Sequence, residues 1–121
     1  MASPNLKNPT TITGITTSVK LSSASITGIL TNNSGSDKVF KINSIFAANS
    51  AAVSGNVDIS ISILRDGIDF YVAKTITVPF GGTQLISTKE SYFYLEENVG
   101  IRAQASVADK ADIIISYEEI S

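Results

Sequence analysis

The chain has 121 residues, which is the size of a single domain. Its 17 Ile and 8 Val outnumber its 6 Leu by about four to one, and side chains branched at Cβ favour strands over helices. Cys, His and Trp are absent, which excludes disulfides, cysteine nucleophiles and metal sites built on thiolate or imidazole ligands. The composition therefore predicts a β-domain with few side chains suited to catalysis.

The net charge of −2 is divided unevenly along the chain. Residues 1–60 carry four lysines against two aspartates, whereas residues 61–121 carry five cations against nine carboxylates. This acidic balance offers no general attraction to nucleic acid. The apolar runs are far shorter than the ~20 residues that span a bilayer, and the first residues do not resemble a secretory signal. We expect neither a nucleic-acid nor a membrane partner.

The first third of the chain is rich in hydroxyl side chains. Residues 1–9, which include Pro4 and Pro9, predict an extended N-terminal arm, followed by a single β-sandwich domain over residues 10–121. Residues 10–36 contain 13 Ser or Thr and no carboxylate. Two strands are predicted there, at 11–21 and 24–31, with Ser22-Ser23 turning the chain between them and 32–36 forming a loop.

Apolar and polar residues alternate clearly from residue 38 onward. Phe40, Ile42 and Phe46 are expected on one face of a strand, and residues 57–64 alternate strictly, which indicates one buried face. Asp66-Gly67 then predicts a hairpin, because Gly accepts a positive φ cheaply. The return strand is expected to place its even-numbered apolar residues on one face. These are Ile68, Phe70, Val72, Ile76, Val78 and Phe80.

Further short strands are expected around 83–88, 91–95, 99–107 and 111–119. No segment shows a helical period over ten or more residues. Eight or nine short strands separated by turn residues predict an all-β fold, either an antiparallel β-sandwich or a jelly roll.

Candidate catalytic groups each have a simpler structural explanation. Without His, a serine nucleophile lacks its usual base, and no Ser-x-x-Lys string occurs. The carboxylate pairs Asp66/Asp69 and Asp109/Asp112 lie at predicted turns or strand ends, where acids are solvated. Residues 66–69 also lack the alternating acids of a calcium loop. We expect no enzymatic activity, no cofactor and no metal site.

Aromatic residues are the candidates for a binding surface. Tyr92, Phe93 and Tyr94 could stack on a sugar, with Tyr71 as a further contact and loops 49–56 and 80–84 shaping the site. Aromatic pairs on neighbouring strands also stabilise sheets without any ligand, so both interpretations stay open.

Four strings in residues 38–121 carry a family resemblance. They are KVFKINSIFAAN (38–49), YVAKTITVP (71–79), YLEE (94–97) and the terminal ISYEEIS (115–121). In this order they resemble the small β-rich structural proteins in virions of tailed bacteriophages, especially those that infect marine cyanobacteria. The resemblance implies a virion protein, made in the host cytoplasm, that contacts other virion proteins such as the major capsid protein or neck and tail proteins.

The leading hypothesis is a non-enzymatic capsid decoration (cement) subunit that acts through repeated protein–protein contacts. Its hydroxyl-rich N-terminal segment could add to a neighbour as an arm or strand, and closed homo-oligomers such as trimers would cover sheet edges. The alternative is a neck or tail accessory, or a fibre-tip module that binds a host receptor or glycan through Tyr71, Tyr92 and Tyr94.

Overall fold

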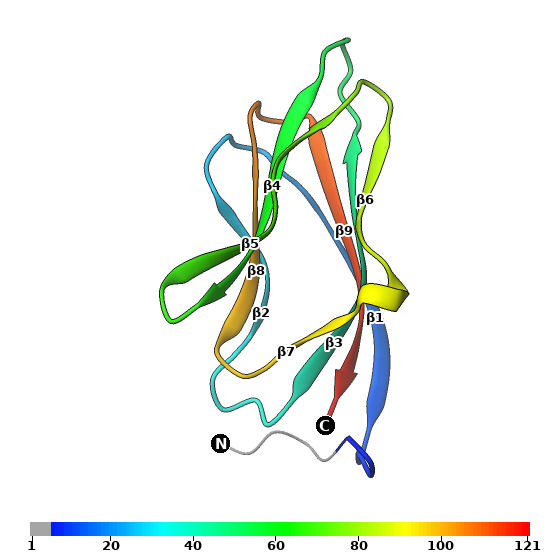
Figure 1. The fold of residues 1–121 in the computed structure, drawn as a ribbon, viewed down its shortest axis with the longest axis vertical. Coiled ribbons are helices and arrows are strands. Elements are labelled where there is room, and N and C mark those ends of the chain that lie inside the picture. The colour runs from blue at the N-terminus through cyan, green and yellow to red at the C-terminus, as the bar shows by residue number, and fades with distance from the viewer. Residues whose placement is uncertain (1–5) are drawn as a thin grey trace.

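A computed structural model describes residues 6–121 as a two-layered stack of β-sheets (Figure 1). The strands are β1 (Ile12–Lys20), β2 (Thr27–Asn32), β3 (Val39–Asn49), β4 (Val57–Arg65), β5 (Ile68–Val78), β6 (Thr83–Ser87), β7 (Phe93–Leu95), β8 (Val99–Ala105) and β9 (Ala111–Ile120). A single 3₁₀ turn, η1 (Lys89–Ser91), joins β6 to β7. Across residues 6–121, no helix is long and apolar enough to cross a membrane.

The strand order confirms the predicted all-β class and makes it a jelly roll. One sheet has the order β1-β9-β3-β6, with β7 also pairing with β3, and the other has the order β2-β8-β4-β5. The antiparallel pairs are therefore nested: β1 pairs with β9, β2 with β8, β3 with β6 and β7, and β4 with β5. This nesting is a long hairpin rolled onto itself, which is the jelly-roll arrangement.

The connection around Ser22-Ser23 turns the chain between two strands, as predicted, but these strands do not pair with each other. β1 pairs with β9 in one sheet, whereas β2 pairs with β8 in the other, so this segment crosses between the layers. Leu21 begins the crossing with a buried side chain, and its N–H donates to the carbonyl of Ala111 at 2.8 Å. Sequence alternation located both strands but carried no information about which strand each one pairs with.

The core lies between the two sheets and consists mainly of aliphatic side chains. As predicted, Val57, Ile59 and Ile61 on β4 are buried. They face Ile42, Ile45, Ile113 and Ile115 of the opposite sheet and pack with Ile101 beside them. Full burial of each such side chain is worth about 1.5–3 kcal/mol.

A β-bulge in β3 overturns the predicted position of Phe46. The pairing of β3 with β9 shifts register between Ile42 and Ser44, so one extra residue reverses the alternation. Ile45 is consequently buried in the core, while Phe46 lies half-buried on the outer face. There its neighbours across the strands are Leu85 and Ile114.

Irregular pairing in β5 likewise overturns the prediction that Val72 lies on the same face as Phe70 and Ile76. The register with β4 shifts on both sides of Ile61, whose partner is Ala73. Val72 is exposed, and beyond the shift Ile76 and Val78 return to the inner face. Thr75 at the shift has φ 61°, and its amide donates to Ser60 Oγ at 3.0 Å. Phe80 lies past the end of the strand and is exposed.

The predicted hairpin at Asp66-Gly67 is confirmed. Arg65 pairs with Ile68, and the two residues between them have φ values of 53° and 77°, as a type I′ turn requires. Figure 1 shows this end of the β4–β5 hairpin projecting sideways from the two layers.

Two buried asparagines link the sheets. Asn32, at the end of β2, donates from Nδ2 to the carbonyl oxygens of Lys38 at 2.8 Å and Leu95 at 3.0 Å. Asn49, at the end of β3, donates to Gly55 at 2.9 Å and Val78 at 3.1 Å. Because Leu95 and Val78 each belong to the sheet opposite the asparagine that bonds them, the amides connect the two layers.

Candidate interaction surfaces

The most apolar exposed segment is at the tip of the β4–β5 hairpin. We call it the hairpin patch, and it consists of Ile68, Phe70, Tyr71 and Val72, all of which are exposed. Phe70 pairs with Ile63 and continues the inner face of the sheet, yet 53% of its surface is accessible. Since this end of the hairpin projects beyond the two layers, the opposite sheet does not cover it (Figure 1).

The composition of the hairpin patch is unusual for a protein surface. Four large apolar side chains are exposed within the five residues from Ile68 to Val72. Single exposed apolar residues are common, but several exposed apolar residues close together, here on both faces of β5, mark surfaces that bind another molecule. β5 is also an edge strand, so a partner could reach both its side chains and one side of its backbone.

A charged network fixes the outer face of the same hairpin. Arg102 on β8 binds the Asp69 carboxylate through both Nε and Nη2, and Ser62 Oγ donates to the same carboxylate at 2.9 Å. The hydrogen bonds from Arg102 lower the pKa of Asp69 below its usual value of 3.8, and Asp69 in turn raises the pKa of Arg102. The network joins β4, β5 and β8, and so orients the strand that carries the patch.

Tyr71 is the candidate tyrosine that lies in the hairpin patch. Its ring is contacted by Lys74, whose Nζ lies 4.7 Å from the ring centroid. Tyr71 therefore contributes a half-covered aromatic surface to the side of β5 that also carries Asp69.

The other two candidate tyrosines lie together on the opposite sheet. Tyr92 and Tyr94 form an edge-to-face pair with ring centroids 5.7 Å apart. Lys41 is the cross-strand partner of Tyr94, and its Nζ lies 4.4 Å from the centroid of Tyr92. The structure thus brings Tyr92 and Tyr94 together in a small cation–aromatic cluster, and places Tyr71 on the other layer.

The loops expected to shape a contact lie next to one another. Asn49 N donates to Gly82 O at 2.9 Å, and Gly81 N donates to Asn49 O at 3.2 Å, which joins the segments between β3 and β4 and between β5 and β6. Figure 1 places both loops at one end of the sandwich, away from the tip of the β4–β5 hairpin. They do not frame Tyr71.

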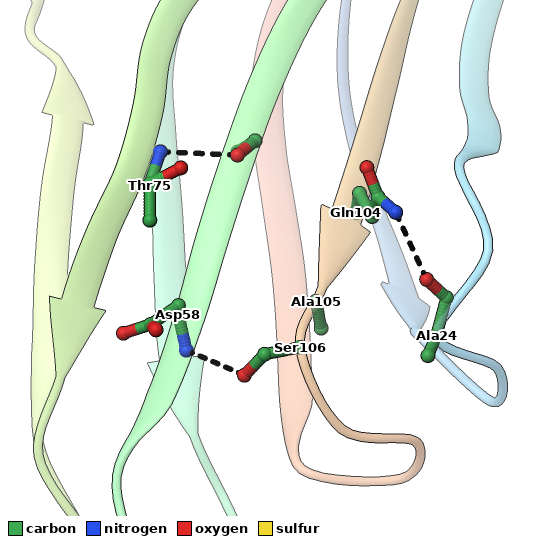
Figure 2. Close-up of a pocket in the computed structure, with 7 residues that line it drawn as sticks. Ala24, Asp58, Thr75, Gln104, Ala105 and Ser106 are labelled. Carbon is green, nitrogen blue, oxygen red and sulfur yellow. Dashed lines mark hydrogen bonds between the residues drawn. The ribbon is translucent and has the colours of Figure 1, made fainter.

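Of two shallow hollows of about 300 Å³ each, one lies on the β2-β8-β4-β5 sheet (Figure 2). Its polar groups are already bonded within the fold. Ser106 Oγ accepts the amide proton of Asp58 at 2.9 Å, and Gln104 Nε2 donates to Ala24 O at 3.1 Å. The Asp58 carboxylate accepts a hydrogen bond from Thr77 at 2.7 Å. These side chains hold loop and strand segments together.

The acidic side chains of the described residues do not gather into a group of three or more that could hold a metal ion. Four ion pairs between strands or loops account for several charges: Lys20–Asp112, Lys38–Glu119, Arg65–Glu96 and Arg102–Asp69. At Asp112 burial raises the pKa, but the bonds from Lys20 and Ser50 outweigh it, so the net shift is downward. The charges of this surface serve mainly to connect neighbouring elements.

Sequence reasoning missed most of the hairpin patch, because it assigned Ile68, Phe70 and Val72 to a buried face. A signal was present in the run Phe70-Tyr71-Val72, in which apolar residues occupy successive positions. Successive residues of a strand point to opposite faces, so such a run has apolar groups on both sides. In a stack of two sheets the outer face of each sheet is not covered by the other sheet, so at least one of those sides remains open.

Comparisons with known proteins identify a shared fold. No protein-family model matches the chain, and no curated protein matches it. Among solved structures, it is similar to a chain from the work described as "Bacillus endospore appendages form a novel family of disulfide-linked pili", with a TM-score of 0.55 and 15% identity over 91% of this chain and 88% of that one. A virus-like particle of the extra small virus of the giant freshwater prawn Macrobrachium rosenbergii gives a TM-score of 0.48 and 10% identity over 91% and 77%. The chain is therefore an antiparallel β-sandwich that shares its fold with the subunit of a Bacillus pilus.

Proposed function

We propose that this chain is a non-enzymatic structural subunit of a virion, and specifically a capsid decoration protein. It acts through contacts that are repeated at every copy, with the hairpin patch docking on a neighbouring shell protein. The resemblance of residues 38–121 to phage virion proteins supplies the biological setting.

The observation that carries this proposal is the uncovered apolar tip of the β4–β5 hairpin. Ile68 and Phe70 continue the register of the buried sheet face, yet more than half of each side chain is accessible. Such side chains gain about 25 cal/mol for every Å² of apolar surface that a partner covers. The Arg102–Asp69 pair holds the strand in place before binding, which reduces the entropy lost on docking.

The fold is compatible with a repeating assembly. The pilus subunit with which it shares this fold belongs to a polymer linked by disulfides, whereas the present chain has no Cys. Any repeated contact of this chain must then rest on apolar burial, backbone hydrogen bonds and charge. Jelly rolls are also frequent among viral capsid proteins, although a shared fold by itself does not determine function.

The fibre-tip alternative uses Tyr71, Tyr92 and Tyr94, and a lysine lies over the rings of Tyr71 and Tyr92. Lys41 occupies a face of the Tyr92 ring, so a sugar could stack there only after that ammonium group moved. Because the hairpin patch has four exposed apolar residues and no lysine within residues 6–121 is recorded over Phe70, the geometry favours a protein partner.

A rebinding experiment tests the decoration role. Particles that carry the subunit are stripped of it, and purified full-length chain is added back while the copies bound per shell are counted. Wild type should bind saturably at regular sites visible by electron microscopy. The double variant Ile68→Asp/Phe70→Asp should bind at least 30-fold more weakly, whereas Val53→Asp, which replaces a loop residue that is 68% exposed, should bind like wild type.

Two results would refute the proposal. One is a wild-type chain that binds only at the neck or tail, or not at all, and the other is a double variant that binds as tightly as Val53→Asp. Binding of the isolated chain to a glycan array, lost in Tyr92→Ala, would support the fibre-tip alternative instead.

A further inference from the structure

β1 is an edge strand whose free side has regularly spaced backbone groups. At one end Thr11 and Ser121 exchange two hydrogen bonds, and at the other Leu21 N donates to Ala111 O. Between these points the pairing of β1 with β9 is continuous, so odd-numbered residues bond to β9 and even-numbered residues face away from it. The outward-facing backbone groups belong to Ile12, Gly14, Thr16, Ser18 and Lys20.

β1 is also the most regular of the edge strands. Its nine residues pair with β9 without a register shift. β2, β5 and β6 each contain a shift in their pairing, and β7 has three residues. Irregular or short edges resist the addition of another strand, whereas a long regular edge accepts one. In Figure 1, β1 lies at the border of its sheet, and no other strand within residues 6–121 pairs with its free side.

The sequence of β1 lacks the usual protection of an exposed edge. It has no proline, no inward-pointing charge, and no charged residue before Lys20 at its end. Its side chains alternate between an inner row, where Ile15 and Val19 pack on the core, and an outer row in which the small or hydroxyl-bearing residues Gly14, Thr16 and Ser18 lie between Ile12 and Lys20. Nothing in this strand opposes pairing with another β-strand.

We infer that β1 pairs with β1 of a second copy of this chain, antiparallel about a twofold axis at Thr16. This register uses the whole strand: Thr16 faces itself, Gly14 faces Ser18 of the second copy, and Ile12 faces Lys20 of the second copy. Every outward-facing backbone group then gains a partner, since even-numbered residues meet even-numbered residues. The two sheets become one continuous sheet across the axis.

Charge is compatible with the antiparallel arrangement of two copies. Lys20 lies at one end of the edge and is paired with Asp112 of its own chain. Glu118 of β9 lies beside Gly14 towards the other end and accepts a hydrogen bond from Asn43. The twofold axis brings the Lys20 end of each copy to the Glu118 end of the other, and no like charges face each other across the axis. A Cβ built on Gly14 meets no atom within 4 Å, so the side chain of Ser18 from the second copy has room there.

Single-cysteine crosslinking tests the register, because the chain has no native Cys. In Thr16→Cys the two introduced sulfurs face each other across the axis, at a Cα separation of about 5.5 Å that permits a disulfide. In Ser18→Cys the equivalent residues lie four positions out of register, roughly 13 Å apart along the strand. Oxidation should therefore convert most of Thr16→Cys, and little of Ser18→Cys, to a covalent dimer.

A second pair of variants tests the edge itself. Thr16→Pro removes an outward-facing N–H without breaking a bond to β9, and Thr16→Val keeps that N–H. In sedimentation equilibrium, wild type and Thr16→Val should be dimeric, and Thr16→Pro should dissociate at least tenfold more readily. Circular dichroism of the Thr16→Pro monomer should retain the β-sheet spectrum.

The inference is wrong if wild type is monomeric at concentrations up to a millimolar, if it forms a trimer, or if Ser18→Cys crosslinks as efficiently as Thr16→Cys. If Thr16→Pro unfolds, the crosslinking pair decides alone. This contact does not use the hairpin patch, so its failure leaves the rebinding test of the decoration role unaffected.

Discussion

Replacement of Asn32 by alanine should destabilise the fold more than any other single polar substitution in the loop that follows β2. The Asn32 side chain is fully buried, and its amide bonds the carbonyls of Lys38 and Leu95. Alanine leaves the Leu95 carbonyl buried without a partner, at a cost of about 1–3 kcal/mol, and removes the half-buried bond to Lys38, worth about 0.5–1.5 kcal/mol. The expected loss in unfolding free energy is therefore about 1.5–4.5 kcal/mol.

Equilibrium unfolding in urea measures this loss as a lower midpoint at an unchanged m-value. For a domain of this size the melting temperature should fall by roughly 6–18 °C. Asn33→Ala is the matched control, since the neighbouring side chain is exposed, and it should stay within about 0.5 kcal/mol of wild type. If Asn32→Ala unfolded at the same urea concentration as Asn33→Ala, the amide link between the two sheets would not be a stabilising interaction.

Three further predictions concern the bulge, the charged network and the patch. Ile45→Thr should lower the unfolding free energy by about 2 kcal/mol, because its side chain is in the core, while Phe46→Thr should cost less than half as much; equal losses in urea unfolding would contradict the bulge. Asp69→Asn should destabilise the protein more at pH 7 than at pH 2: the pKa of Asp69 is lowered on folding, so its contribution is present above its usual value of 3.8 and is lost as the pH falls through the folded pKa. Urea midpoints that differ equally at both pH values would refute this. Phe70→Ser should weaken shell binding about 10- to 50-fold in the rebinding assay, since covering half of a phenylalanine is worth about 1.5–2.5 kcal/mol.

The sequence located the strands because alternation reports which residues face a core. Val57, Ile59 and Ile61 show this most directly, and all three are buried. Alternation fails wherever a bulge adds a residue, since one residue reverses every later position in the strand. Phe46 is on the outer face for this reason, and the placement of Val72 failed in the same way.

Asn32 was assigned to a loop because asparagines are frequent in turns. Its role depends instead on the carbonyl of Leu95, which is 63 residues away in the chain. No local pattern reports a partner at that separation. The same limit applies to the candidate surface: that Phe70 is uncovered depends on where the opposite sheet ends, which is a property of the assembled sandwich.

The two proposed contacts are connected because they lie on different sheets. β1 borders one layer, whereas the hairpin patch belongs to the other, so pairing through β1 leaves both patches of a dimer open. Two linked patches bind a shell with an effective concentration that can reach the millimolar range, which strengthens attachment without any new contact. Thr16→Pro should then weaken apparent shell binding even though it leaves Phe70 unchanged, and Phe70→Ser should leave dimerisation unchanged. This asymmetry separates a subunit that dimerises and then docks from one that uses a single surface for both.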